Sequence, residues 1–79
     1  MSIAERLAIL FQTIFQIDGD KFSPDLRPED LRLWDSVGHM NLVMALEQRF
    51  GVRFEADEIT EMTSAGRILE ILKTKGVEG

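Results

Sequence analysis

Residues 33–54 read LWDSVGHMNLVMALEQRFGVRF, and this stretch predicts the helix around which the rest of the chain is arranged. Asp35 fits the N-cap, because its carboxylate can accept hydrogen bonds from backbone N–H groups that the first turn leaves unpaired. Gly51 fits the left-handed position that commonly ends a helix. The stretch therefore predicts a helix over residues 36–50, with Ser36 in its first turn.

Ser36 brings a hydroxyl group to the positive end of this predicted helix. That end favours negative charge, and its free N–H groups can bind phosphate. A phosphate ester on Ser36 would lie close to those donors. The pattern predicts an exposed hydroxyl at the helix start, with a polar flank and an apolar flank.

Over nearly its whole length the chain resembles the acyl carrier proteins. Members of this family carry phosphopantetheine on the serine of an Asp-Ser-Leu or Asp-Ser-Val motif at the start of the second of four helices. The matching residues are Asp35, Ser36, Val37, Leu42, Val43, Met44, Ala45, Leu46, Glu47, Phe50, Gly51 and Phe54. A lone Asp-Ser-Val is a weak signal, but the motif with this helix, chain length and charge is specific.

The resemblance implies a carrier and not an enzyme, most similar to a free-standing, specialised bacterial member of the family. Ser36 would be the attachment point of 4'-phosphopantetheine supplied by coenzyme A, and Asp35 would belong to the flanking motif. The expected partners are a phosphopantetheinyl transferase and acyl-loading and acyl-transferring enzymes with basic docking surfaces. The cargo would be an acyl group of fatty-acid, polyketide or related biosynthesis.

Composition excludes several other classes of protein. The 79 residues predict a single domain over 1–79, and the absence of cysteine excludes disulfides and thiolate metal sites. A net charge of −5 disfavours nucleic acids and anionic membranes as partners and favours basic protein surfaces. No apolar run approaches the roughly 20 residues of a membrane span, and no signal-peptide pattern is visible. We expect a cytoplasmic monomer.

Apolar residues at helical spacing predict three further helices. Together the four predicted helices cover residues 3–16, 36–50, 55–62 and 65–75. The third is short, and the long connection over residues 17–34 contains one helical turn at Pro28–Asp30. On the last helix the core face is expected at Ala65, Ile68, Leu69 and Leu72, with Ile71 near it. The fold prediction is all-α, a four-helix bundle of the acyl-carrier type with a long first loop.

Two apolar stripes run along the predicted helix over residues 36–50. The first comprises Val43, Leu46 and Phe50, with Leu42 at its border, and predicts core contacts. The second comprises Val37, Met40 and Met44. Either both stripes are core, or the second is a half-exposed patch beside Ser36. Methionine suits a surface that docks on several partners, and in the family the matching positions contact partner enzymes.

Acidic residues are the second expected feature of a docking surface. The candidates are Glu47, Asp57, Glu58 and Glu61. They are either a solvated face or, by the resemblance, an acidic partner-binding surface. Gly38 and Asn41 occupy positions that are often acidic in carriers of fatty-acid synthesis, which favours a specialised pathway.

Trp34 and His39 flank the modification motif. Many family members have a glycine shortly before Asp-Ser, whereas this chain has Arg32-Leu33-Trp34. Trp34 fits a hydrophobic staple against His39, or alternatively an exposed contact with a partner or the prosthetic arm. A catalytic Ser36–His39 pair is disfavoured because no acid or oxyanion hole accompanies it. A solvated histidine is expected.

An acyl chain carried on the arm could be held in the core between the second, third and fourth helices. Candidate lining residues are Val43, Leu46, Ile59, Met62 and Ile68. Two alternatives stay open at this stage. One is a peptidyl or aminoacyl carrier loaded by an adenylating enzyme, and the other is an unmodified helical interaction module.

Overall fold

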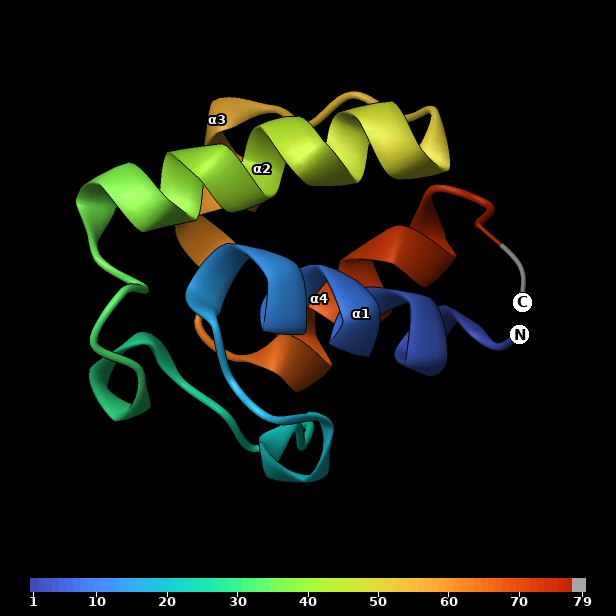
Figure 1. Cartoon of the computed structure of the whole chain (residues 1–79). Helices are drawn as coiled ribbons and strands as arrows, with labels where there is room; N and C mark the ends of the chain where they lie inside the picture. Colours follow the sequence, from blue (N-terminus) through green and yellow to red (C-terminus); the bar gives the residue numbers. More distant parts are fainter. Residues whose placement is uncertain (78–79) are drawn as a thin grey trace.

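The computed structural model describes residues 1–77, which form helices and turns without a β-strand (Figure 1). The elements are α1 (Ile3–Phe15), η1 (Gly19–Lys21), η2 (Pro28–Asp30), α2 (Ser36–Phe50), α3 (Ala56–Glu61) and α4 (Ala65–Thr74). Figure 1 shows α2 above α1 and α4, with most of the long connection below α1. The predicted all-α bundle with a short third helix is confirmed.

Local capping explains where the helices begin and end. Ser2 and Glu5 form a capping box at the start of α1. The Asp35 carboxylate caps α2, and the Ser64 hydroxyl caps α4, each accepting a hydrogen bond from the third helical N–H. Gly51 ends α2 in the left-handed conformation with φ of 66°. These contacts span three residues or fewer at each start, so the sequence reveals them directly.

The hydrophobic core lies between α1, α2 and α4. Its buried members are Ile3, Leu7, Leu10, Phe11, Phe15, Trp34, Leu42, Val43, Leu46, Met62, Ala65, Ile68, Ile71 and Leu72. Leu42, predicted at the border, is fully buried, whereas Phe50 is half-buried. On α4, Leu69 is partly buried and packs against the core, whereas Ile71, predicted near the core face, is buried. Among residues 1–77, no helix is both long and apolar enough to cross a membrane.

Trp34 anchors the long connection directly before Asp35 and Ser36. Its side chain is only 2% exposed. Its ring lies 5.0 Å from the Phe11 ring in an edge-to-face arrangement and 5.5 Å from the Phe15 ring in a stacked one. Trp34 also stacks on His39, five residues along the chain, so the predicted staple is confirmed. The backbone that enters α2 is therefore held by the core itself.

Gly38 is buried where this connection crosses the first turn of α2. A Cβ atom at this position would overlap the carbonyl oxygen of Leu33 and would lie 3.2 Å from a ring carbon of Phe15. Only glycine lets the connection approach so closely. An acidic side chain has no room at this position. The packing of the connection therefore explains the glycine without any requirement for partner binding.

Candidate functional site

Ser36 is the first residue of α2 and is exposed to solvent. The hydroxyl groups of Ser2 and Ser64 accept backbone hydrogen bonds at the starts of their helices. At α2 that role belongs to Asp35, whose Oδ1 accepts from the Gly38 N–H at 2.8 Å. Within residues 1–77, Ser36 Oγ has no hydrogen-bond partner, and the hydroxyl is accessible for modification.

An open cleft of about 750 Å³ begins at Ser36. It lies between η2, the start of α2 and α3. Its apolar lining comes from Pro28, Trp34, Met40, Ile59 and Met62, and its polar lining from Arg27, Glu29, Asp35, Ser36, His39, Thr60 and Thr63. A phosphate at Ser36 would have helix-start N–H groups beside it, and a flexible amide-containing arm would find both apolar walls and hydroxyl groups. The residues present fit such a group.

His39 is not the solvated side chain that the sequence predicted. Trp34 Nε1–H donates to His39 Nδ1 at 2.8 Å, and His39 Nε2 lies 3.0 Å from the carbonyl oxygen of Ile59. An indole N–H can only donate and a carbonyl can only accept, so Nδ1 is the acceptor and Nε2 carries the hydrogen. Both ring nitrogens are engaged, which leaves no base for Ser36 and removes the support for a Ser–His hydrolase.

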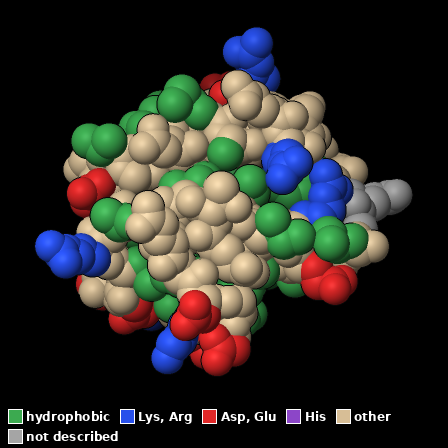
Figure 2. Space-filling view, viewed as in Figure 1, with side chains coloured by type: hydrophobic (Ala, Val, Ile, Leu, Met, Phe, Trp, Pro, Cys, Tyr) green, Lys and Arg blue, Asp and Glu red, His purple; other side chains and the backbone are tan. Residues whose placement is uncertain are grey.

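The second stripe of α2 is an exposed apolar patch, which we call the α2 patch. Val37 is 71% exposed, Met40 48% and Met44 53%. Leu33 is exposed as well and precedes the motif. Figure 2 shows hydrophobic side chains on the surface over α2. The interpretation of both stripes as core is therefore wrong, and the surface beside Ser36 is apolar.

The predicted acidic residues are held within the chain to different degrees. The Glu47 carboxylate accepts a hydrogen bond from the Phe54 N–H at 2.9 Å. Glu58 accepts from the backbone N–H of Glu55 and pairs with Lys75 Nζ at 2.9 Å. Asp57 is exposed in the first turn of α3.

This arrangement favours the charged form of Glu58. The backbone N–H of Glu55, and secondarily Lys75, lowers the pKa of Glu58 below its ordinary value. Both contacts favour the carboxylate over the protonated acid. Glu58 therefore contributes to capping and fastening α3, and its charge is offset locally by that of Lys75.

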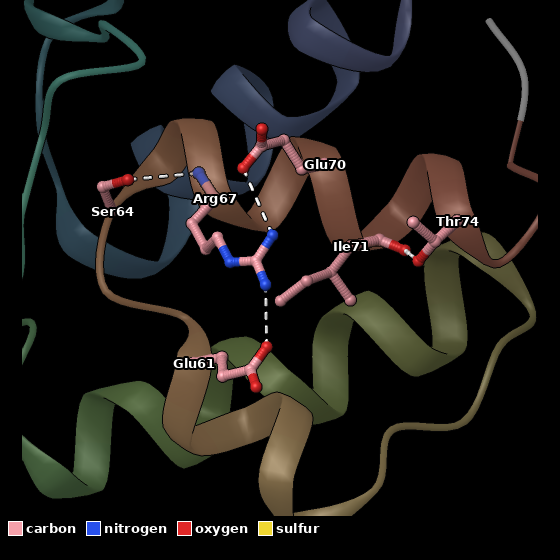
Figure 3. A network of polar contacts seen from close by, with 6 residues as sticks. All are labelled: Glu61, Ser64, Arg67, Glu70, Ile71 and Thr74. Atoms are coloured by element: carbon pink, nitrogen blue, oxygen red, sulfur yellow. Dashed lines mark hydrogen bonds and ion pairs between the residues drawn. The ribbon is translucent and has the colours of Figure 1, made fainter.

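At the C-terminal end of α3, the negative charge of Glu61 is offset by the positive charge of Arg67. The Arg67 guanidinium lies 2.8 Å from Glu61 and 3.3 Å from Glu70 (Figure 3). These carboxylates raise the pKa of Arg67 above its ordinary value, with Glu61 the larger cause. The α3 surface is consequently less negative than its sequence alone indicates.

The predicted acyl-pocket residues divide between the core and the cleft. Val43, Leu46 and Ile68 are buried in the core. Ile59 is half-buried on α3, and Met62 is buried just beyond it, and both line the cleft beside Ser36. Ile59 and Met62 thus lie between the cleft and the core.

Sequence reasoning missed several contributors to this site, among them Pro28, Glu29 and Thr63 in the cleft lining. Arg27 and Thr60 line the cleft, and Leu33 both extends the α2 patch and packs its carbonyl over Gly38. The staple spacing of Trp34 and His39 was the one available signal that His39 would be engaged.

Comparison with known proteins places the chain among phosphopantetheine-dependent carriers. A family model described as the phosphopantetheine attachment site matches residues 5–72. An acyl carrier protein of Lactobacillus johnsonii is 31% identical over 72 residues, which cover 91% of this chain and 90% of that relative. Such proteins are carriers and not enzymes, and phosphopantetheine is their prosthetic group. The chain belongs to the acyl carrier protein family.

Proposed function

We propose that Ser36 is the residue that carries 4'-phosphopantetheine and that the arm's thiol carries acyl groups as thioesters between biosynthetic enzymes. The observation that carries the proposal is that Asp35, and not Ser36, caps α2. Asp35 caps the helix, so the exposed Ser36 hydroxyl is left without an intrachain partner among residues 1–77. Forming the Ser36 Oγ–phosphorus bond breaks the pyrophosphate link of coenzyme A, and the adenosine bisphosphate leaves.

The α2 patch is the proposed docking surface for the phosphopantetheinyl transferase and for the enzymes that load and unload the carrier. Val37, Met40 and Met44 are exposed within three turns of Ser36. Exposed apolar side chains on one helix face are typical of protein contact sites. Methionine also adapts to partners of different shape.

The acidic residues are proposed to form the rim of this surface toward basic partners. Asp57 is exposed, whereas Glu47, Glu58 and Glu61 already bind groups of this chain. A basic partner would have to compete with Lys75 and Arg67 for the last two. Apolar contact therefore accounts for more of the proposed docking than charge does.

The core between α2, α3 and α4 is proposed to hold the acyl chain transiently. The proposed lining residues are Val43, Leu46, Ile59, Met62 and Ile68. Support comes from the continuity between the cleft at Ser36 and the core through Ile59 and Met62. We further propose that the carrier is cytoplasmic and monomeric. Asn41 occupies a position that is often acidic in carriers of fatty-acid synthesis, which supports a role in a specialised pathway.

The test is the intact mass of the chain after incubation with coenzyme A and a broad-specificity phosphopantetheinyl transferase. Wild type and a Ser64→Ala variant should each gain one phosphopantetheine, and Ser36→Ala should gain none. Ser64 is the matched control because it also stands at a helix start but caps it. A folded wild-type chain that gains nothing would favour an unmodified interaction module. Subsequent loading by an adenylating enzyme with an amino acid would favour the aminoacyl carrier.

A further inference from the structure

We propose that His39 controls the passage of an acyl chain from the Ser36 cleft into the core, and so sets which acyl chains this carrier shields. This inference rests on the proposed function of Ser36. In this role His39 is a positioning residue, because it acts by fastening α3 to α2 at the mouth of the cleft. Its partners are the indole of Trp34 and the carbonyl group of Ile59.

Few contacts attach α3 to the rest of the molecule. This helix has six residues, and none of them is fully buried. So short a helix depends on tertiary contacts for its stability. Its polar attachments are the Glu58–Lys75 pair, the Glu61–Arg67 pair and the hydrogen bond from His39 to Ile59.

The contact between His39 and Ile59 lies at the cleft. His39 and Ile59 both line the cleft that begins at Ser36, whereas Lys75 and Arg67 do not. Behind Ile59 lies Met62, which is buried in the core. A chain that starts at Ser36 and enters the core must pass between α2 and α3, and the His39–Ile59 hydrogen bond spans that passage.

Contacts with Trp34 restrain rotation of the His39 side chain. Its ring is nearly parallel to the Trp34 ring, at an angle of 17°, and its Nδ1 is the acceptor for the buried indole N–H. Rotating the imidazole would leave that N–H buried without a partner, which is unfavourable. Trp34 is in turn packed against Phe11 and Phe15. The bond across the passage is therefore anchored in the core, and α3 is the part that yields.

Two amide variants separate the contacts of His39. His39→Asn keeps an acceptor near the position of Nδ1, for the Trp34 N–H, but is too short to bond the Ile59 carbonyl. His39→Gln keeps a donor near the position of Nε2, for the Ile59 carbonyl. Arg67→Gln is the matched control, because it removes the Glu61–Arg67 attachment of α3 away from the cleft. A net hydrogen-bond contribution corresponds to about a 3- to 10-fold change in the open population.

The experiment loads each holo variant with an octanoyl group and measures how fast hydroxylamine cleaves the thioester. The expected result is cleavage about 3- to 10-fold slower in His39→Asn than in wild type, because the chain enters the core more readily. Arg67→Gln should match wild type, and His39→Gln, which keeps a donor to Ile59, should be cleaved faster than His39→Asn. Equal rates for His39→Asn and wild type would overturn the role of His39 and leave the carrier function intact, whereas failure to form the holo protein would overturn the proposed function.

A second measurement uses the wild-type chain alone, so it does not depend on a variant that folds. The sequence contains one histidine and one tryptophan, so each gives a single set of ring nitrogen NMR signals. Octanoyl loading should shift the His39 Nε2 signal together with the methyl signals of Leu46 and Ile68. Methyl shifts without a change at His39 Nε2 would show that the chain enters by another route, and an absence of methyl shifts would show that it stays outside. Either result overturns the proposal.

Discussion

Replacing Gly38 by alanine tests how the connection before Ser36 is held. Helix propensity alone predicts stabilisation by about 1 kcal/mol, since alanine favours a helix interior over glycine. The structure predicts the opposite sign, because the new Cβ would overlap the Leu33 carbonyl oxygen and touch the Phe15 ring. The backbone of Leu33 has to move away, and Trp34 moves with it.

The expected size follows from what Trp34 loses. Its indole N–H would lose the 2.8 Å hydrogen bond to His39, and leaving such a buried donor unpaired costs about 1–3 kcal/mol. Removing a large aromatic side chain from a core costs about 3–5 kcal/mol, and a displaced Trp34 forfeits part of that. After subtraction of the propensity gain, Gly38→Ala should lower the free energy of unfolding by about 1–3 kcal/mol.

Urea and thermal unfolding followed by fluorescence measure this directly, because Trp34 is the only tryptophan. A chain of this size should lose roughly 4–8 °C in Tm per kcal/mol, and the native emission of Trp34 should shift to longer wavelength. Asn41→Ala, on an exposed position of the same helix, is the control and should be neutral or slightly stabilising. A Gly38→Ala variant that gains about 1 kcal/mol with unchanged Trp34 emission would refute the reasoning.

Three further perturbations have defined outcomes. Asp35→Ala should cost about 1 kcal/mol in urea unfolding by removing the cap, whereas Ser36→Ala should be nearly neutral, and equal losses in the two would contradict the separation of cap and attachment site. Met44→Glu should leave the unfolding free energy within about 0.5 kcal/mol yet raise the KM of the phosphopantetheinyl transferase, and an unchanged KM would exclude the α2 patch from docking. Glu58 has a lowered pKa in the folded chain, so its contribution is present above its ordinary pKa of 4.5 and is lost as pH falls through the lowered value. Glu58→Gln should therefore make the free energy of unfolding depend less on pH below about pH 4.5. An unchanged pH dependence in that range would show that the contacts of Glu58 with Glu55 and Lys75 contribute nothing to stability.

The helices and their caps could be predicted because their determinants are local. Asp35, Ser64 and the Ser2–Glu5 pair each form hydrogen bonds with a residue three positions away, so both partners can be identified from the sequence. The degree of burial of individual residues on α4 was predicted less well. Leu69 and Ile71 are equally apolar, and only the position of α4 against α1 and α2 decides which of them is buried.

The parts of the site that escaped prediction depend on contacts between distant segments. His39 was expected to be solvated because nothing nearby showed that α3 would bring the Ile59 carbonyl to it. The acidic residues of α3 were expected to be free to bind partners, because Lys75, which pairs with Glu58, lies 17 residues further along the chain. Gly38 looked like a missing acid until the path of the connection over it was known.

The central claim is that the Ser36 hydroxyl is the attachment point of the prosthetic arm. Its most direct test is fragmentation mass spectrometry of the wild-type chain after reaction with coenzyme A and the transferase. The account predicts that the phosphopantetheine mass lies only on fragments that contain Ser36. Finding it on fragments around Ser2, Ser23 or Ser64, or finding a folded chain that stays unmodified, would contradict the account.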